Sequence, residues 1–306
     1  MIRIFIYLLI VESFLLGNLV GGFQGSYNSV ATDAISGSLG NINILNNKNV
    51  FGPQNNPALM MNEKYSFGIS YNHMSLDRYS QSIIFRFNVP PSANASLGYN
   101  GNGVKHIVGR NSIGEITNNY NWSNHNIFFT FGIKANNLVS LGLKLNIYFQ
   151  NVIEEINSTG LGLDFGVFIN PLDRMSFALS IKNIKSKTNW KINMDDGTLR
   201  DYNEYFPIIY SLANHYQLSK EINFYSQFNF YNDKEIGYIG SENNFGLEYI
   251  LNNFEYPIFF RSGLNDKNYS LGFTLPYKSL FHLNYAVNFS KLNSGTNHIF
   301  SWEIKL

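Results

Sequence analysis

Residues 139–150 read VSLGLKLNIYFQ, and this stretch decides the fold class. Apolar and polar residues alternate along it, with Val139, Leu141, Leu143, Leu145, Ile147 and Phe149 on one side and Ser140, Gly142, Lys144, Asn146, Tyr148 and Gln150 on the other. A period of two is the pattern of a β-strand with two unlike faces. Strands of soluble sheets usually run about five or six residues, whereas a tilted strand that crosses a membrane needs about ten. The length therefore favours a transmembrane strand.

The same alternation recurs through most of the chain from residue 65 to residue 306. It is clear at 222–230, at 281–289 and at 300–306. Division of the sequence at its turn residues gives about fourteen strands, and bacterial single-chain barrels have an even number. Most of the connections alternate between short and long, as in barrels with short turns at one end and longer loops at the other. We expect an all-β fold, a transmembrane antiparallel β-barrel of about fourteen strands.

Two insertions, residues 102–125 and 185–205, interrupt the strand pattern. Ser112 is followed three residues later by Glu115, which is a capping box and predicts a short helix over Ser112–Asn119 in an extracellular loop. Glu115 and Trp122 in the first insertion, and Trp190 in the second, are candidate external residues for contact with a partner. The alternative is that both insertions are disordered surface loops.

The composition agrees with a barrel. Aromatic residues make up 16% of the chain and charged residues 14%, which is more and less, respectively, than in ordinary soluble domains. The mean hydropathy of −0.14 is what two unlike faces average to. A net charge of +1 without any run of Lys or Arg gives no reason to expect nucleic acid as a partner. Because the chain has no Cys, it has no disulfide framework and no thiol nucleophile.

The first 22 residues are typical of a secretory signal peptide. Arg3 supplies the positive start, Ile4 to Leu16 are apolar except for Glu12 and Ser13, and small residues follow. The alternative, an N-terminal membrane anchor, needs an apolar run of about 20 residues, and this run is shorter. Since no later segment could form a membrane-spanning helix, an exported chain with amphipathic strands fits the bacterial outer membrane. Lipid of that membrane is an expected partner.

Motifs for enzymatic chemistry are missing from the sequence. The six His residues show no metal-ligand spacing, and neither a nucleophile elbow nor a phosphate loop occurs. We therefore expect no catalytic residue, no metal and no cofactor. Asp164, on the polar face of its strand, is a candidate lumen residue, with a catalytic role much less favoured. Glycines at 132, 142, 160, 162 and 166 would let another backbone approach the wall closely.

Residues 23–64 lack the alternation and are rich in Gly, Ser and Asn. The stretch from Gly37-Ser38-Leu39-Gly40-Asn41 through Asn56-Pro57-Ala58-Leu59 resembles the N-terminal region of PorV/PorQ-type outer-membrane proteins, relatives of the FadL-type long-chain fatty-acid transporters. The resemblance continues at Gly160–Gly166, Asn170-Pro171, Phe245–Tyr249 and Phe260–Gly263. It implies a fourteen-stranded barrel at 65–306 and an N-terminal plug at 23–64, with Asn56, Pro57 and Ala58 inside the lumen. The alternative is that Asn56-Pro57 is only a turn before the first strand.

The chain departs from the family pattern at Asn46-Asn47-Lys48-Asn49, where an aspartate is usual. This departure leaves in doubt any role of acidic residues there.

The resemblance leaves three functions open. The FadL side implies passage or binding of a long-chain hydrophobic molecule, with a route opened by a shift of the plug. The PorV side implies a component of type IX secretion that binds the C-terminal domains of secreted proteins and passes them to a surface peptidase. The third is a purely structural barrel. Apolar side chains that point inward near the plug would favour transport, whereas exposed apolar surface on the two insertions would favour a protein partner.

Overall fold

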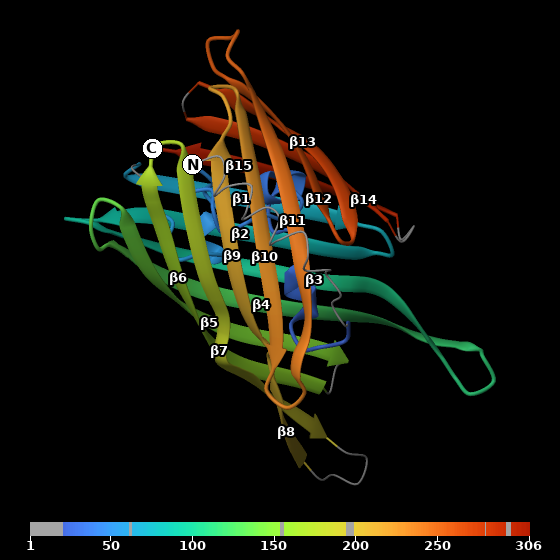
Figure 1. The fold of residues 1–306 in the computed structure, drawn as a ribbon. Helices are drawn as coiled ribbons and strands as arrows, with labels where there is room; N and C mark the ends of the chain where they lie inside the picture. Colours follow the sequence, from blue (N-terminus) through green and yellow to red (C-terminus); the bar gives the residue numbers. More distant parts are fainter. Residues whose placement is uncertain (1–20, 61–62, 154–155, 194–198, 279, 292–294) are drawn as a thin grey trace.

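The computed structural model describes residues 21–306 except 61–62, 154–155, 194–198, 279 and 292–294. Fourteen strands form the wall of a barrel (Figure 1). They are β1 (Tyr65–Met74), β2 (Arg78–Val89), β3 (Ala93–Arg110), β4 (Ile116–Lys134), β5 (Val139–Ile153), β6 (Ile156–Leu172), β7 (Met175–Asn193), β9 (Ile208–Gln217), β10 (Ile222–Asp233), β11 (Gly237–Leu251), β12 (Ile258–Asn265), β13 (Asn268–Tyr277), β14 (Phe281–Ser290) and β15 (Thr296–Lys305).

The wall closes on itself. Each strand pairs antiparallel with its neighbour, β1 pairs with β15, and β7 pairs with both β6 and β9. A further strand, β8 (Leu199–Tyr205), pairs with the far half of β7 and extends that hairpin beyond the barrel. The fourteen-stranded antiparallel barrel predicted from the alternation is therefore confirmed.

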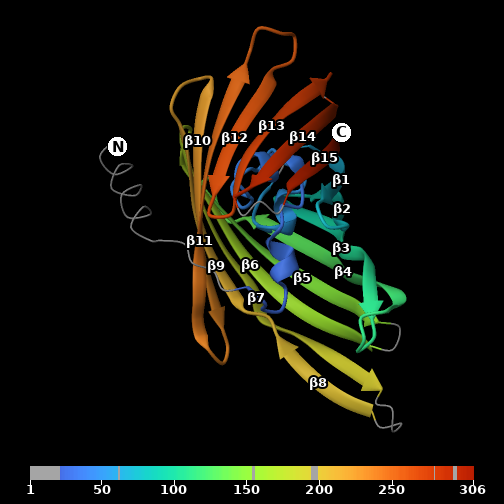
Figure 2. The same ribbon diagram turned by 90° about the vertical axis from the view of Figure 1, so that its right-hand side faces the viewer.

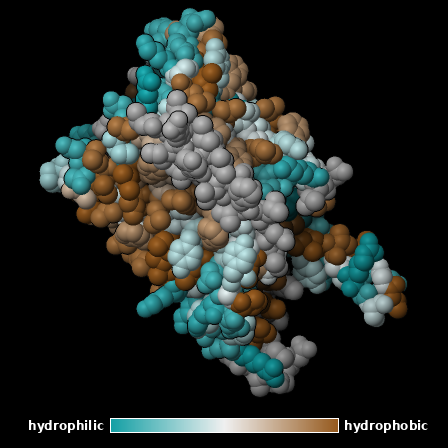
Figure 3. Space-filling model, viewed as in Figure 1, coloured by the Kyte–Doolittle hydropathy of each residue, from teal (hydrophilic) through white to brown (hydrophobic). Residues whose placement is uncertain are grey.

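The alternation puts apolar residues outside and polar residues inside. On β5, Leu143 and Leu145 are 50% and 57% exposed, whereas Lys144 and Asn146 are 6% and 1% exposed. Figure 3 shows a broad hydrophobic area on the outer wall, with hydrophilic residues gathered at the projecting ends. This arrangement is the reverse of a soluble protein and suits a wall that faces hydrocarbon.

The predicted helix at Ser112–Asn119 is wrong. β3 and β4 continue as a long hairpin up to a turn at 111–115. The side-chain oxygen of Asn111 accepts hydrogen bonds from the backbone N–H groups of Ile113 and Glu115, and its amide donates to the Glu115 carboxylate at 2.9 Å. Asn111 thus holds the glutamate that a capping box would need, and Gly114, at φ 86°, completes the turn. The second insertion is likewise the β7–β8 hairpin.

The N-terminal segment, residues 23–60, lies inside the ring of strands (Figure 2). It contains the 3₁₀ turns η1 (Ser26–Ser29) and η2 (Gly52–Gln54) and the short helix α2 (Ala34–Ser38), whose N-cap is Asp33. α2 lies against β12 to β15. Apolar residues of the segment meet apolar side chains that the wall turns inward: Val50 and Phe51 pack with Ile84 and Phe128, and Ala34 of α2 packs with Ala286 and Ile299.

Among the described residues, no helix is long and apolar enough to span a membrane. Residues 1–20 of the predicted signal peptide lie outside the described part of the chain.

Candidate functional site

Asn56, Pro57 and Ala58 lie against the inner face of β4, β5 and β6. Asn56 is fully buried, and its amide donates to the backbone carbonyls of Ile44 at 3.0 Å and Val167 at 3.2 Å. Its side-chain oxygen accepts from the N–H of Ala58 at 3.1 Å, which closes the turn. The tripeptide therefore joins two parts of the N-terminal segment to the barrel wall.

A row of three glycines makes room for this turn. Gly132, Gly142 and Gly166 are directly opposite one another on β4, β5 and β6. A Cβ on Gly142 would lie 2.3 Å from the carbonyl of Pro57, and one on Gly166 would lie 2.0 Å from the Asn56 side-chain oxygen. Such distances are impossible, so only glycine allows this approach. Gly160 and Gly162, from the same sequence cluster, instead face Thr188 and Ser186 of β7.

Three inward-facing cations of the same wall, of which Arg86 and Lys144 are buried, bind carbonyl oxygens of the segment. Lys144 donates to the Gln54 carbonyl at 2.7 Å, and Lys182 donates to the Asn55 side chain at 3.0 Å. Arg86 donates to the carbonyls of Asn49 at 3.1 Å and Leu59 at 2.7 Å. Charged donors form stronger hydrogen bonds than neutral ones.

Asp164, the candidate lumen residue, is buried on β6, and its neighbours satisfy its carboxylate. Lys144 lies 3.3 Å from it, Asn146 donates at 3.0 Å, and the backbone N–H of Asn183 donates at 2.8 Å. These contacts give Asp164 the role of fixing Lys144, the residue that holds the segment.

Inside the lumen, the opposite wall holds the segment with neutral groups, and its charged contact, from Lys305 of β15 to the Lys48 carbonyl at 2.6 Å, is exposed. Gly40 donates its N–H to the Ser270 hydroxyl at 3.0 Å and accepts from the Asn265 amide at 3.1 Å, while Ala34 donates to Ser301 at 2.8 Å. Gly263 provides the space, because a Cβ there would lie 2.0 Å from the nitrogen of Gly40.

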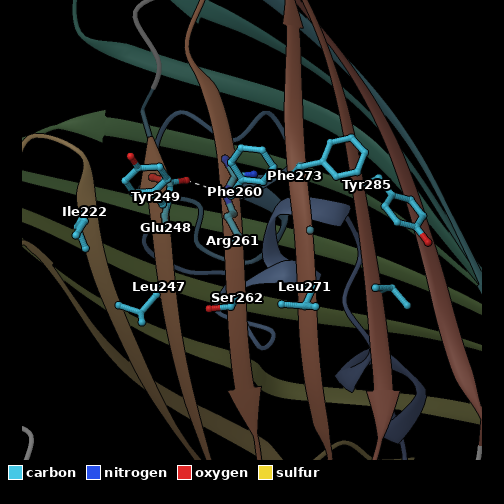
Figure 4. Close-up of a pocket in the computed structure, with 12 residues that line it drawn as sticks. Ile222, Leu247, Glu248, Tyr249, Phe260, Arg261, Ser262, Leu271, Phe273 and Tyr285 are labelled. Atoms are coloured by element: carbon cyan, nitrogen blue, oxygen red, sulfur yellow. Dashed lines mark hydrogen bonds and ion pairs between the residues drawn. The ribbon is translucent and has the colours of Figure 1, made fainter. Parts of the chain in front are cut away.

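A polar chamber of about 380 Å³ lies at the end of the barrel with the short turns. One of its sides is an ion pair between Arg261 of β12 and Glu248 of β11, at 2.7 Å (Figure 4). Figure 4 also shows Leu247 and Ser262 next to this pair on β11 and β12, and Leu271 on the neighbouring β13. They line an apolar groove of about 560 Å³ on the outer face of the wall.

Aromatic side chains gather where the N-terminal segment enters the barrel. Residues 21–24 line a notch of about 260 Å³ between β8 and the β10–β11 hairpin. Phe206 is buried there and stacks on Tyr148 at 4.7 Å between ring centroids. The Phe23 ring lies 5.7 Å from Tyr231. A Cβ on Gly25 would lie 2.6 Å from the Phe206 ring, and the φ of 82° also favours glycine, so only glycine fits at this position.

The three external candidates do not form one site. Glu115 is exposed at the β3–β4 turn, and Trp190 donates to the Glu204 carboxylate at 2.8 Å across the β7–β8 pair. Trp122 is half-buried at the barrel mouth, with its ring 5.3 Å from Tyr27. In the described part of the chain, no three His, Asp or Glu side chains are grouped to hold a metal ion.

Sequence reasoning missed the three inward-facing cations. Lys144 and Lys182 occupy inward positions of their strands, as Arg86 does, and a cation on an inward face needs a partner. That signal shows that a partner exists, but it does not show that the partner is a backbone carbonyl of a segment far away in the sequence.

In sequence, no family model and no curated protein match the chain. Solved structures that share its fold include hydrocarbon channels and a FadL homologue. The toluene transporter TodX of Pseudomonas putida matches with a TM-score of 0.66 at 10% identity, over 90% of this chain and 99% of its own. The CymD monoaromatic hydrocarbon channel matches with a TM-score of 0.64 at 11% identity, over 92% and 99%. A Pseudomonas aeruginosa FadL homologue gives 0.62 at 10% identity, over 94% and 99%. The chain therefore has the fold of FadL-type barrels.

Proposed function

We propose that this protein is an outer-membrane barrel that passes a small hydrophobic molecule, with the N-terminal segment as its plug. The observation that carries the proposal is the filled lumen. Buried cations, glycine seats and the Asn56-Pro57-Ala58 turn hold the segment across the barrel. A barrel of this strand number would otherwise have a lumen wide enough to leak.

The aromatic notch supports an apolar route beside the plug. Phe206, Tyr148 and Tyr231 turn inward beside residues 23–25, whereas amide side chains line much of the remaining open lumen. A hydrophobic molecule gains free energy against aromatic rings and loses it where it separates amides from water. Movement of the segment away from Phe206 would open a path along these rings. The printed functions of TodX and CymD, transport of toluene and passage of monoaromatic hydrocarbons, agree with such a cargo.

A disulfide can test whether the segment must move. A Cβ on Gly37 in α2 would lie 3.7 Å from the Cβ of Ala286 on β14, close to the ordinary spacing of about 3.8 Å in a disulfide, although the end of Ile299 must give way. Because the chain has no other Cys, the double variant Gly37→Cys/Ala286→Cys can form only this intramolecular bridge.

We expect cells that lack their own hydrocarbon channel to take up labelled toluene faster with the wild-type protein than with an empty vector. The double variant should take up no toluene when oxidised and should regain uptake after reduction. Uptake by each single variant should be the same under oxidising and reducing conditions. Uptake no faster than with the empty vector would refute hydrocarbon passage. Uptake that persists in the oxidised variant would refute movement of α2.

A protein partner is the second candidate function, and one observation favours it. The β3–β4 hairpin projects beyond the barrel and exposes Ile107, Val108, Ile113 and Ile116. Exposed apolar side chains on a projecting hairpin are typical of protein-binding surfaces. If this barrel receives secreted proteins, a purified C-terminal domain of such a protein should bind it, and Ile113→Asp/Ile116→Asp should weaken the binding. Equal binding by the variant would argue against this surface.

A further inference from the structure

The mouth of the barrel holds an open space that is not lined by the aromatic rings of the proposed hydrophobic route. This vestibule, of about 480 Å³, lies above η1 and is bordered by the β1–β2, β12–β13 and β14–β15 turns. Its size is that of sites for small ligands. It joins a smaller polar space of about 80 Å³ that shares Asn41, Asn102 and Glu242 with it.

Amide side chains dominate the lining. Six asparagines line the vestibule: Asn41, Asn102, Asn265, Asn268, Asn288 and Asn297. In the smaller space, Asn100 and Asn126 are 9% and 5% exposed, and within the described part of the chain their side-chain oxygens have no hydrogen-bond partner. Buried amide oxygens without a partner need a donor. A ligand that carries several hydroxyl groups would supply donors to these oxygens and acceptors to the amide N–H groups.

Three aromatic rings stand among these amides. Tyr27, Tyr79 and Trp122 line the vestibule, and the Trp122 ring meets Tyr27 edge to face at 5.3 Å. A sugar ring has an apolar C–H face and a rim of hydroxyl groups, so it stacks on an aromatic ring while amides bind its rim. Aromatic rings surrounded by asparagines match that chemistry.

The charged side chains of the vestibule are few, and each already has a partner. Glu242, which is 2% exposed, faces this space and accepts from the Tyr231 hydroxyl at 3.2 Å. The guanidinium of Arg78 already donates to the backbone carbonyl of Ser75 at 3.0 Å, and Lys267 lies 3.8 Å from Glu242. Because Lys267 offsets Glu242 and Ser75 holds Arg78, the asparagines supply most of the remaining hydrogen-bonding groups of the vestibule.

We propose that the vestibule binds a saccharide, with Trp122 as the stacking residue and the surrounding asparagines as hydrogen-bonding groups. Two sources would supply a sugar with this chemistry: a free glycan, or the sugar part of a surface lipopolysaccharide. The vestibule shares no lining residue with the notch beside residues 21–24, so saccharide binding can be tested apart from hydrocarbon passage.

Binding is tested with the full chain in an amine-oxide detergent, because maltoside detergents carry sugar headgroups that would compete. Fluorescently labelled protein is applied to an array of neutral glycans and of oligosaccharides released from lipopolysaccharide by mild acid. Trp122→Ala and Asn102→Leu are the test variants, and Trp190→Ala, far from the vestibule, is the matched control. Retained mobility of the unheated barrel in gel electrophoresis shows that each variant is folded.

We expect wild type and Trp190→Ala to bind the same glycans. Trp122→Ala should bind them at least about tenfold more weakly, because it loses the ring on which the sugar stacks. Retention on neutral glycans identifies a free sugar, whereas retention only on the released oligosaccharides identifies lipopolysaccharide. If no glycan binds wild type more strongly than the folded Trp122→Ala or Asn102→Leu variants, the proposal is overturned.

Discussion

The wall from β2 to β7 and the wall from β11 to β15 hold the same N-terminal segment with different chemistry. The first, which we call the cation wall, uses Arg86, Lys144 and Lys182. The second, the hydroxyl wall, uses Ser270, Ser301 and the amide of Asn265 inside the lumen. Its contact from a cation, Lys305 to the Lys48 carbonyl, is exposed to solvent. A hydrogen bond from a charged group contributes about 1.5–3 kcal/mol, and a neutral one about 0.5–1.5 kcal/mol. The segment should therefore separate first from the hydroxyl wall, with the Asn56-Pro57-Ala58 turn as the fixed point.

The largest loss of stability is expected when a cation of the cation wall is removed. Lys144→Met should lower the free energy of unfolding by about 3–5 kcal/mol, because it leaves the buried carboxylate of Asp164 without its cation. Urea unfolding in lipid vesicles, followed by tryptophan fluorescence, measures this loss. The double variant Lys144→Met/Asp164→Asn should regain much of it. An equal loss in the double variant would show that the ion pair is not the cause.

The next largest effect is expected on the outer face of β5, at Leu143, the residue next to Lys144. Leu143→Arg places a charge on the apolar side of β5 and should cost about 2–4 kcal/mol near the middle of the membrane. The same unfolding assay should show that the outer-face variant Leu143→Met remains close to wild type. Wild-type stability of Leu143→Arg would contradict a lipid-facing position.

A steric change tests the glycine seat without touching charge. Gly142→Leu should cost about 1–3 kcal/mol by overpacking, since its Cβ would meet Pro57 at 2.3 Å. Ser262→Leu adds the same side chain on the outer face and should leave stability nearly unchanged. If the two variants lose the same stability, crowding against the N-terminal segment is not the reason.

The smallest effect belongs to the hydroxyl wall. Ser270→Ala removes a neutral hydrogen bond to Gly40 and should cost about 1 kcal/mol. Amide hydrogen exchange should show faster exchange at residues 34–41 than at residues 54–59 in this variant. Faster exchange at 54–59 would reverse the order in which we expect the two walls to release the segment.

The barrel could be predicted because the period of two is a local property. The alternation in residues 139–150 divides β5 into two unlike faces, and the structure turns Leu143 outward and Lys144 inward. The helix at Ser112–Asn119 was wrong for a local reason as well, since Asn111, one residue before the capping box, binds Glu115 first.

The site could be predicted only in part. The glycine cluster and the Asn56-Pro57-Ala58 motif were both visible in the sequence, but their contact joins residues about 80 to 110 positions apart, counting from Asn56 and Pro57 to Gly142 and Gly166. Nothing local indicates which carbonyl Lys144 binds, because the choice depends on how the N-terminal segment folds inside the closed barrel. The vestibule is formed by several turns brought together, so the sequence could present Trp122 only as an external candidate and not as part of a pocket.

Single-channel conductance of the purified barrel in planar lipid bilayers tests most directly whether the N-terminal segment closes the lumen. We predict that wild type and Ser270→Ala stay closed at low voltage, whereas Lys144→Met and Gly142→Leu show open steps because the segment is released from the cation wall. Wild-type steps as large as those of the two cation-wall variants would contradict the account, because the lumen would then be open with the segment in place.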